Sequence, residues 1–298
     1  MKKFTITEFR ETYPNEDACL DKLFNLRFKD CPCPKCNSTK KFTKVKDRRA
    51  YQCPSCGFQV HPTKGTIFEK STTPLTHWFY AIFLQTTTRN GVAAKELERQ
   101  LNICYKTALR MSHQIKLLMA NKKADGKPKN PLLMGLIECD ESFIGRLNKN
   151  RHADKKVPNS QGRSHKDKTP VFAMLKRGGE ISVHVVEDTK GSTLKPIIDA
   201  NVDKEISIIV TDEWLGYNKL SKEYRHVVIN HLNEEYVRGA FHTNTIEGFW
   251  SQLKRTIKGT HIQVSKKHLQ KYVDEVAFRY MQRDKQETMF ETILSHVA

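Results

Sequence analysis

The sequence lacks a long hydrophobic run. Its longest apolar patch, residues 78–84, is far shorter than the roughly 20 apolar residues that a helix needs to cross a bilayer. The opening segment, MKKFTITEFRETYP, has no apolar stretch of the kind that a secretory signal contains. A glycine after Met1 and a C-terminal cysteine box, which would direct lipid attachment, are also missing. We therefore expect no membrane association.

The sequence is also short of acidic residues. It has 33 aspartates and glutamates against 51 lysines and arginines, which gives a net charge of +18. Such an excess repels itself unless a polyanion neutralises it, so nucleic acid is the first partner to consider. A protein of the membrane surface would need a strongly amphipathic basic helix, which we do not find. These features predict a cytoplasmic protein associated with the nucleoid.

Four of the eight cysteines form two Cys-x-x-Cys pairs, Cys33 with Cys36 and Cys53 with Cys56. Sixteen residues separate the pairs, which is the spacing of a structural zinc site with four thiolate ligands. The spacing predicts one zinc ion in a zinc ribbon over residues 29–66. Cys31 is an alternative to Cys33 as the first ligand.

Two segments of the N-terminal half favour DNA contact. Basic residues gather at the tip of the ribbon, where they would meet phosphates: Lys44, Arg48 and Arg49. Residues 67–120 then show two short helical patterns, 92–101 and 104–119, with a break at Asn102, as in a helix-turn-helix domain. The start of the second helix would reach base edges through Tyr105, Lys106, Thr107 and Arg110.

The polar segment 121–131 predicts a linker between an N-terminal half, which opens with a helical segment at 1–28, and a C-terminal domain at 132–298. In that domain, the pattern predicts strands at 136–145, two within 171–188, 206–214 and 224–231, and helices at 192–202 and 242–257. The order β-β-β-α-β-α-β-α indicates an α/β domain with three antiparallel strands followed by parallel ones.

Three acidic residues of this domain are candidate metal ligands. Asp140 lies in the first strand, Asp212 at the end of the fourth, and Glu247 on the helix that follows the sheet. Carboxylates that converge at strand ends favour two Mg²⁺ or Mn²⁺ ions, which suit phosphoryl transfer. Lys254, two turns beyond Glu247, would hold a phosphate.

Each of these acids has an alternative explanation. Glu138 points to the same strand face as Asp140, and Glu213 directly follows Asp212. Asn244 and Glu247 also have the spacing of a capping box, in which the glutamate would only satisfy a backbone N–H.

The motifs CPKC and CPSCG, GVAAKELERQLNICYKTALRM, ECDESFIG, VTDEWLGY and HTNTIEGFWSQLKR together resemble those of the zinc-ribbon DDE transposases of insertion sequences, a bacterial family related to Merlin transposons. The resemblance implies a ribonuclease-H-like mixed sheet with helices, preceded by the ribbon and the helix-turn-helix domain. It assigns catalysis to Asp140 rather than Glu138, with Asp212, Glu247 and Lys254, and DNA contact to Lys254 and Arg255. His242 and Asn244 would shape the site, and Asn244 is an alternative third catalytic residue.

The same resemblance implies an activity. Such a protein would bind the terminal inverted repeats of its element as a homo-oligomer on double-stranded DNA, cleave the ends, and join the 3′-hydroxyl to target DNA by metal-dependent transesterification. The alternatives are a ribonuclease-H-like nuclease that only cuts, and a domesticated DNA-binding regulator without catalysis.

Overall fold

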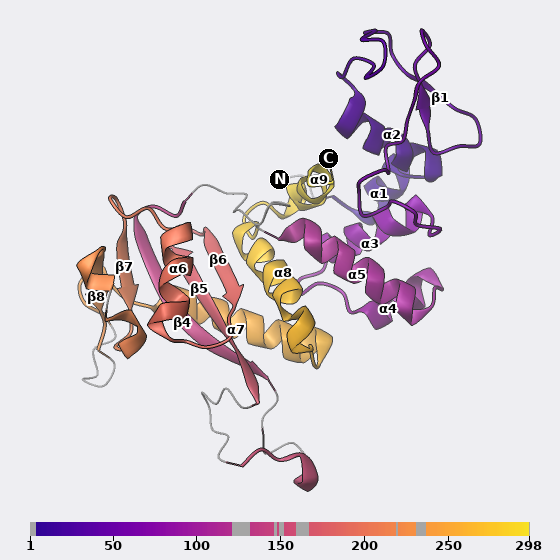
Figure 1. Cartoon of the computed structure of the whole chain (residues 1–298). Helices are drawn as coiled ribbons and strands as arrows, with labels where there is room; N and C mark the ends of the chain where they lie inside the picture. Colours follow the sequence, from indigo (N-terminus) through magenta and orange to yellow (C-terminus); the bar gives the residue numbers. More distant parts are fainter. Residues whose placement is uncertain are drawn as a thin grey trace. The chain divides into compact units, whose positions relative to one another are not determined.

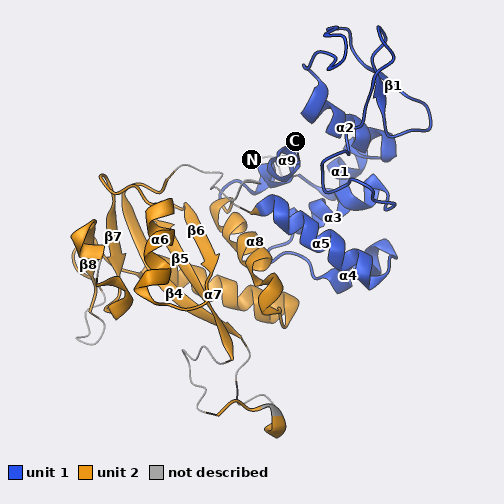
Figure 2. Ribbon diagram, in the orientation of Figure 1, with its two compact units in different colours: residues 1–119, 284–298 blue, residues 120–283 orange. Residues whose placement is uncertain are grey.

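A computed structural model describes residues 4–120, 132–145, 148, 152–158, 167–218, 220–230 and 237–297. The chain divides into two compact units, residues 1–119 with 284–298, and residues 120–283 (Figure 2). The division falls where the predicted linker begins, although the linker itself, 121–131, lies outside the described residues. Each unit is considered below by itself.

The first unit opens with helices α1 (Ile6–Thr12) and α2 (Glu16–Phe28). Asn15 caps α2 by accepting a hydrogen bond from the backbone N–H of Ala18 at 3.0 Å, as helix starts with asparagine commonly do. A three-stranded antiparallel ribbon follows, made of β1 (Thr43–Lys44), β2 (Tyr51–Gln52) and β3 (Gln59–Val60). The ring of Phe24 stacks on that of Tyr51 with centroids 3.9 Å apart, so α2 covers the ribbon.

A helical layer completes this unit. It consists of α3 (Leu75–Thr87), α4 (Ala94–Leu101), α5 (Tyr105–Met119) and α9 (Met289–Ser295). The last of these was expected in the C-terminal domain, but α9 packs on α3. The reason is aromatic burial: the Phe290 ring lies 5.6 Å from that of Tyr13 and 6.3 Å from that of Phe79. The end of the chain therefore returns to the core of the first unit.

The second unit is built on a five-stranded mixed sheet with the order β6-β5-β4-β7-β8 (Figure 1). The strands are β4 (Leu136–Gly145), β5 (Lys168–Lys176), β6 (Ile181–Val185), β7 (Ile208–Thr211) and β8 (Arg225–Val228). The first three are antiparallel, whereas β4, β7 and β8 run parallel, as predicted. Gly178 and Gly179 form the turn between β5 and β6 with φ of 111° and 121°, which favour glycine.

Helices cover both faces of this sheet. α6 (Gly191–Asn201) packs on one face, while α7 (Asn244–Thr256) and α8 (Leu269–Met281) pack on the other. Side chains alternate along β4, so Ile137 and Cys139 join the core beneath α6, and Glu138 and Asp140 face α7. This alternation decides which acids can lie near α7.

The connection between β7 and β8 differs from the prediction of a helix there. Its described residues form only two 3-10 turns, Leu215–Tyr217 and Leu220–Lys222. The other short turns are a π-helical turn at the end of α7 and 3-10 turns elsewhere: Ile257–His261, Ala153–Lys155, Lys266–His268 and Gln286–Thr288. Among the helices that the structure describes, none has the length and apolar character needed to span a bilayer.

Candidate active site and metal centre

The two cysteine pairs adopt matching turns. In the first turn, the N–H of Asn37 donates to the carbonyl of Cys33 at 2.8 Å, and in the second, the N–H of Gly57 donates to that of Cys53 at 2.9 Å. Asn37 and Gly57 both have a left-handed backbone, with φ of 53° and 73°. The sequence uses asparagine and glycine here because these residues tolerate that conformation best.

These turns bring four thiol groups together. The Sγ atoms of Cys33 and Cys56 are 3.6 Å apart, those of Cys36 and Cys53 are 3.7 Å apart, and all four lie within 4.8 Å of one another. A tetrahedral zinc ion with Zn–S bonds of about 2.3 Å requires sulfurs about 3.8 Å apart, so the four residues fit a structural zinc ion. Cys31 stays outside this group, with its exposed thiol directed at the carbonyl of Arg27, so Cys33 rather than Cys31 belongs to the four-thiol group.

The basic residues at the tip of the ribbon differ in their surroundings. Lys44 forms an ion pair with Asp17 at 2.6 Å, and Arg49 pairs with Glu16, so both tie the ribbon to α2. Arg48 is exposed. Of the three residues predicted to contact DNA, Arg48 is therefore the one that points its charge to solvent.

The start of α5 presents most of its predicted DNA-contacting side chains to solvent. Tyr105 is 46% exposed, Lys106 is exposed, and Thr107 is half-buried beside Cys104. Arg110 is exposed, but its guanidinium donates to the hydroxyl of Ser71 at 3.1 Å and lies over the ring of Trp78, which fixes its orientation.

Helix α7 is fixed to strand β4 at its first turn. The buried carboxylate of Glu138 accepts hydrogen bonds from the backbone N–H of Ile246 at 3.0 Å and from the hydroxyl of Thr245 at 2.8 Å. Free N–H groups at a helix start need such acceptors, and a negative charge there also suits the helix dipole. Glu138 therefore has a structural role: it anchors the start of α7 to β4. The sequence alone had left Glu138 as an alternative to Asp140.

The capping-box interpretation of Glu247 is wrong. The N-cap of α7 is Thr243 rather than Asn244, and its side chain makes no capping hydrogen bond, because Glu138 supplies the acceptor from the neighbouring strand. Glu247 lies one position beyond the capping-box site and is exposed. Asn244 is the first helical residue and is exposed too.

A basic group completes this anchor. Arg177 donates to Glu138 at 3.0 Å and contacts the Nδ1 atom of His242 at 3.2 Å. His242, predicted to shape the site, therefore lies in the group that holds the start of α7, 3.5 Å from the carboxylate of Glu138.

Asp140 lies two residues after Glu138 on β4 and is also held by hydrogen bonds. Its Oδ2 atom accepts a hydrogen bond from the indole N–H of Trp250 at 2.9 Å, and its Oδ1 atom accepts one from the backbone N–H of Glu141 at 2.7 Å. Trp250 lies one turn after Ile246 on α7, and Asp140 lies two residues after Glu138 on β4, so successive turns of the helix contact successive inward-facing residues of the strand. Glu141 faces the other side of the sheet, where its carboxylate accepts from the hydroxyl of Tyr217 at 2.7 Å.

Asp212 lies at the carboxyl end of β7. Strand β7 pairs with β4 in parallel register, with Glu138 opposite Val210. The pairing extends no further, and Asp212 directly follows β7, at the same end of the strand pair as Asp140. The Oδ1 atom of Asp212 accepts from the backbone N–H of Trp214 at 3.1 Å, which fixes the turn after the strand. Glu213 follows Asp212 in this turn and is half-buried.

The three predicted carboxylates do not form a tight cluster. Within the described parts of the chain, only the cysteines have ligand atoms all within 4.8 Å of one another. The hydroxyl of Thr243 lies 3.5 Å from the carboxylate of Glu247, which remains exposed at the first turn of α7. Two ions about 3.5–4 Å apart do not require all three acids to be this close, because only an acid shared by the ions must reach both.

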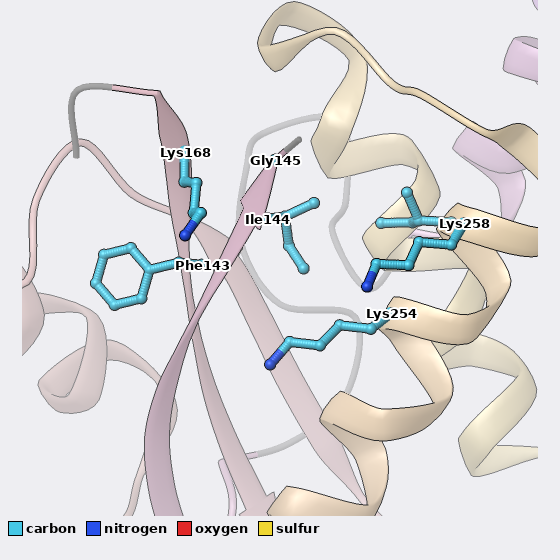
Figure 3. A pocket seen from close by; sticks show the side chains of 7 residues that line it. Phe143, Ile144, Gly145, Lys168, Lys254 and Lys258 are labelled. Atoms are coloured by element: carbon cyan, nitrogen blue, oxygen red, sulfur yellow. The ribbon is translucent and has the colours of Figure 1, made fainter. Parts of the chain in front are cut away.

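Lys254 borders a pocket of about 230 Å³ at the far end of α7 (Figure 3). Loss of solvent around its ammonium group lowers the pKa of Lys254; Asp140 raises that pKa in opposition, and Lys258 and Lys168 lower it further. Lys168 and Lys258 also line the pocket, and sequence reasoning missed both. Arg255 is exposed on the same helix.

Comparisons with known proteins agree with these features. Residues 132–281 match the ISXO2-like transposase domain, and residues 14–59 match the transposase zinc-ribbon domain. An uncharacterized protein in transposable element ISH50 of Halobacterium salinarum is 26% identical over 301 residues, which cover 95% of this chain and 99% of the relative.

A solved chain in the simian T-cell lymphotropic virus intasome, in complex with PP2A regulatory subunit B56 gamma, aligns with 61% of this chain and 63% of its own length. Its 13% identity and TM-score of 0.28 are too low to bear on the fold. The family match spans half of the sequence and contains the sheet, α7 and every candidate acid. The chain belongs to the family of ISXO2-like transposases.

Proposed function

We propose that this transposase binds the terminal inverted repeats of its element, cleaves the element ends, and joins the freed 3′-hydroxyl to target DNA by transesterification. The observation that carries the proposal is the parallel pairing of β4 and β7: Asp140 and Asp212 both lie beyond its last paired residues, and Asp140 is bonded to Trp250 of α7. The same helix carries Glu247. A mixed sheet with acids on its first and fourth strands supports assignment to the ribonuclease-H-like class.

The acidic residues would hold two Mg²⁺ or Mn²⁺ ions, since their donors are all oxygen. Such ions activate the attacking oxygen and stabilise the leaving oxygen in an in-line displacement at phosphorus. Asp140 and Asp212 would supply the shared ligands. Glu247 is our third ligand, with Asn244 as the alternative, because both are exposed at the first turn of α7.

Neighbouring residues would position these ligands. Trp250 holds one oxygen of Asp140, which leaves that carboxylate in a fixed orientation. Glu138 and Arg177 hold the first turn of α7, which carries Glu247. Lys254 would bind a phosphate of the cleaved strand. It interacts electrostatically with Asp140, which raises the pKa of Lys254.

The first unit would recognise the element ends. Helices α4 and α5 are joined through Asn102, whose φ of 50° makes the tight break of a helix-turn-helix, and the exposed Tyr105 and Lys106 open the second helix. Arg48 of the zinc ribbon would add a phosphate contact. Because transposition joins two element ends, we propose that the protein acts as a homo-oligomer on DNA.

A DNA assay tests this function. A duplex that carries the terminal sequence flanking the gene should be bound by the protein, cut in the presence of Mg²⁺, and joined to a target plasmid. Cutting without joined products would indicate a nuclease only. Binding with no Mg²⁺-dependent cutting would indicate a non-catalytic regulator.

A further inference from the structure

Three lysines share one pocket in the second unit. Lys168 begins β5, Lys254 lies in the last turn of α7, and Lys258 lies in the π-helical turn that follows, a backbone feature often found at functional sites. Figure 3 shows Lys254 and Lys258 extending from the helix toward the strand that carries Ile144, with Lys168 on the neighbouring strand. None of the seven described residues that line the pocket is acidic.

The pairing of β4 and β5 places Lys168 close to Gly145 at the pocket. Gly145 ends β4 opposite Lys168. A Cβ atom at Gly145 would lie 2.8 Å from the backbone oxygen of Asp167 and 2.9 Å from the side chain of Lys168, so only glycine allows the two strands to approach here. The close approach of the two strands at Gly145 therefore fixes the backbone position of Lys168 at the pocket wall.

The position of the pocket along α7 gives its distance from the acids. Helix and strand run in step: Ile246 meets Glu138, Trp250 meets Asp140, and the pocket joins the end of α7 to Ile144. A strand rises about 3.3 Å per residue, so Ile144 lies about 13 Å beyond Asp140. DNA rises about 3.4 Å per nucleotide along its axis, so for a duplex whose axis runs along β4 this span corresponds to about four nucleotides.

We propose that Lys168 and Lys258, together with Lys254, bind the backbone of the DNA strand about three to five nucleotides from the scissile phosphate. The inference rests on the proposed function and adds two positioning residues to it. Lysines act as point charges on phosphates, and a pocket of about 230 Å³, with Ile144 and Ile257 in its wall, has room for one sugar-phosphate unit.

Mutual repulsion of the lysines supports an anionic occupant. Lys258 and Lys168 each lower the pKa of Lys254, because each of their positive charges repels the charge of Lys254. A phosphate among them would remove that repulsion. A pocket built only for packing would have no reason to concentrate like charges.

Salt titration of DNA binding tests the proposal in the full-length protein. For a duplex with the element's own end, each lost phosphate contact should reduce the slope of log affinity against log salt by about 0.9. We expect that reduction for Lys168→Gln and for Lys258→Gln. Lys222→Gln is the control, because Lys222 is exposed before β8, at the opposite end of the sheet from Asp212. Thermal unfolding of each variant confirms that it is folded.

A neutral backbone locates the contact. Methylphosphonate linkages placed singly along both strands should weaken binding by the wild type when they lie about three to five nucleotides from the cut. The same linkages should have a smaller effect on the Lys168→Gln, Lys258→Gln double variant, in which Lys254 alone of the three lysines remains. Unchanged slopes, or interference as strong in the double variant as in the wild type, would overturn the proposal.

Two further outcomes separate the possible failures. If inorganic phosphate alone protects Lys258 from acylation while the element-end duplex does not, the pocket binds a free anion and the inference fails. If the wild type neither binds nor cuts the element end, the proposed function itself fails, whatever the lysine variants do.

Discussion

The carboxylate of Glu138 on β4 accepts a hydrogen bond from the backbone N–H of Ile246 on α7 at 3.0 Å. This one contact crosses more than a hundred residues of sequence and fixes the level at which α7 begins on the sheet. Asp140 and Trp250 repeat the relationship one turn later. These two contacts fix the position of α7, which carries Glu247, relative to β4, which carries Asp140.

Replacing Glu138 with alanine should destabilise the protein. The change leaves the N–H of Ile246 and the guanidinium of Arg177 without their buried acceptor, which should lower the free energy of unfolding by about 3 kcal/mol. Urea unfolding measures this. Glu180→Ala is the matched control, since its ion pair with Lys176 is largely exposed and should contribute less than about 1 kcal/mol. Equal losses in the two variants would argue against the anchor.

Replacing Trp250 with phenylalanine should weaken metal binding. The ring remains, but Asp140 loses the indole N–H that orients it, and changes of this kind reduce metal affinity by about 10–100-fold. Titration with Mn²⁺ measures the effect. Trp78→Phe in the first unit also removes a buried indole hydrogen bond, to Ser71 at 3.1 Å, and should leave Mn²⁺ affinity unchanged. Wild-type affinity in Trp250→Phe would refute the role given to this tryptophan.

Two adjacent cysteines should behave differently toward zinc. Cys33→Ser should lose the bound ion and unfold the ribbon, because three thiolates no longer close a tetrahedral site. Cys31→Ser should retain about one zinc per chain, since Cys31 faces the carbonyl of Arg27 instead. Native mass spectrometry reports the stoichiometry directly. Retention of zinc by Cys33→Ser would return Cys31 to the ligand set.

The lowered pKa of Lys254 should appear in its reactivity. At a pH below the ordinary lysine value of about 10.4, a lowered pKa leaves more neutral amine, so Lys254 should acylate faster than Lys222. Asp140 raises this pKa, so Asp140→Asn should lower it further and speed acylation. Lys258 lowers it, so Lys258→Gln should slow acylation.

The contribution of Lys254 to DNA binding should follow the same titration. The positive charge of Lys254 is lost as pH rises through its lowered pKa. The affinity for DNA should therefore begin to fall at a lower pH than an ordinary lysine would cause.

Peptide mass spectrometry after brief acylation measures the acylation rates of Lys254 and Lys222. A rate for Lys254 that does not respond to Asp140→Asn would show that the two groups are not coupled.

Local patterns predicted the local structure. Alternation and apolar content predicted a strand at 136–145, which β4 matches along its whole length. The cysteine spacing predicted a four-thiolate group, and the four thiols do lie together. In each case, the atoms that interact are close in sequence.

Contacts between distant segments were not predictable in this way. The capping of α7 by Glu138 comes from another element, so the spacing of Asn244 and Glu247 was misleading. Phe290 returns to the first unit because aromatic rings more than two hundred residues away provide a core for it. Lys168 and Lys258 share a pocket only because β5 and the end of α7 meet in the fold.

The most direct test compares Asp212→Asn with Glu213→Gln in a strand-transfer assay on the element-end duplex. Asp140 and Asp212 both lie beyond the last paired residues of the parallel strands β4 and β7, and Glu213 is the acidic neighbour to which the proposal gives no metal role. We predict that Asp212→Asn binds the end normally but forms no joined product, and that Glu213→Gln forms it at close to the wild-type rate. Joined product at the wild-type rate in Asp212→Asn would contradict the proposed active site.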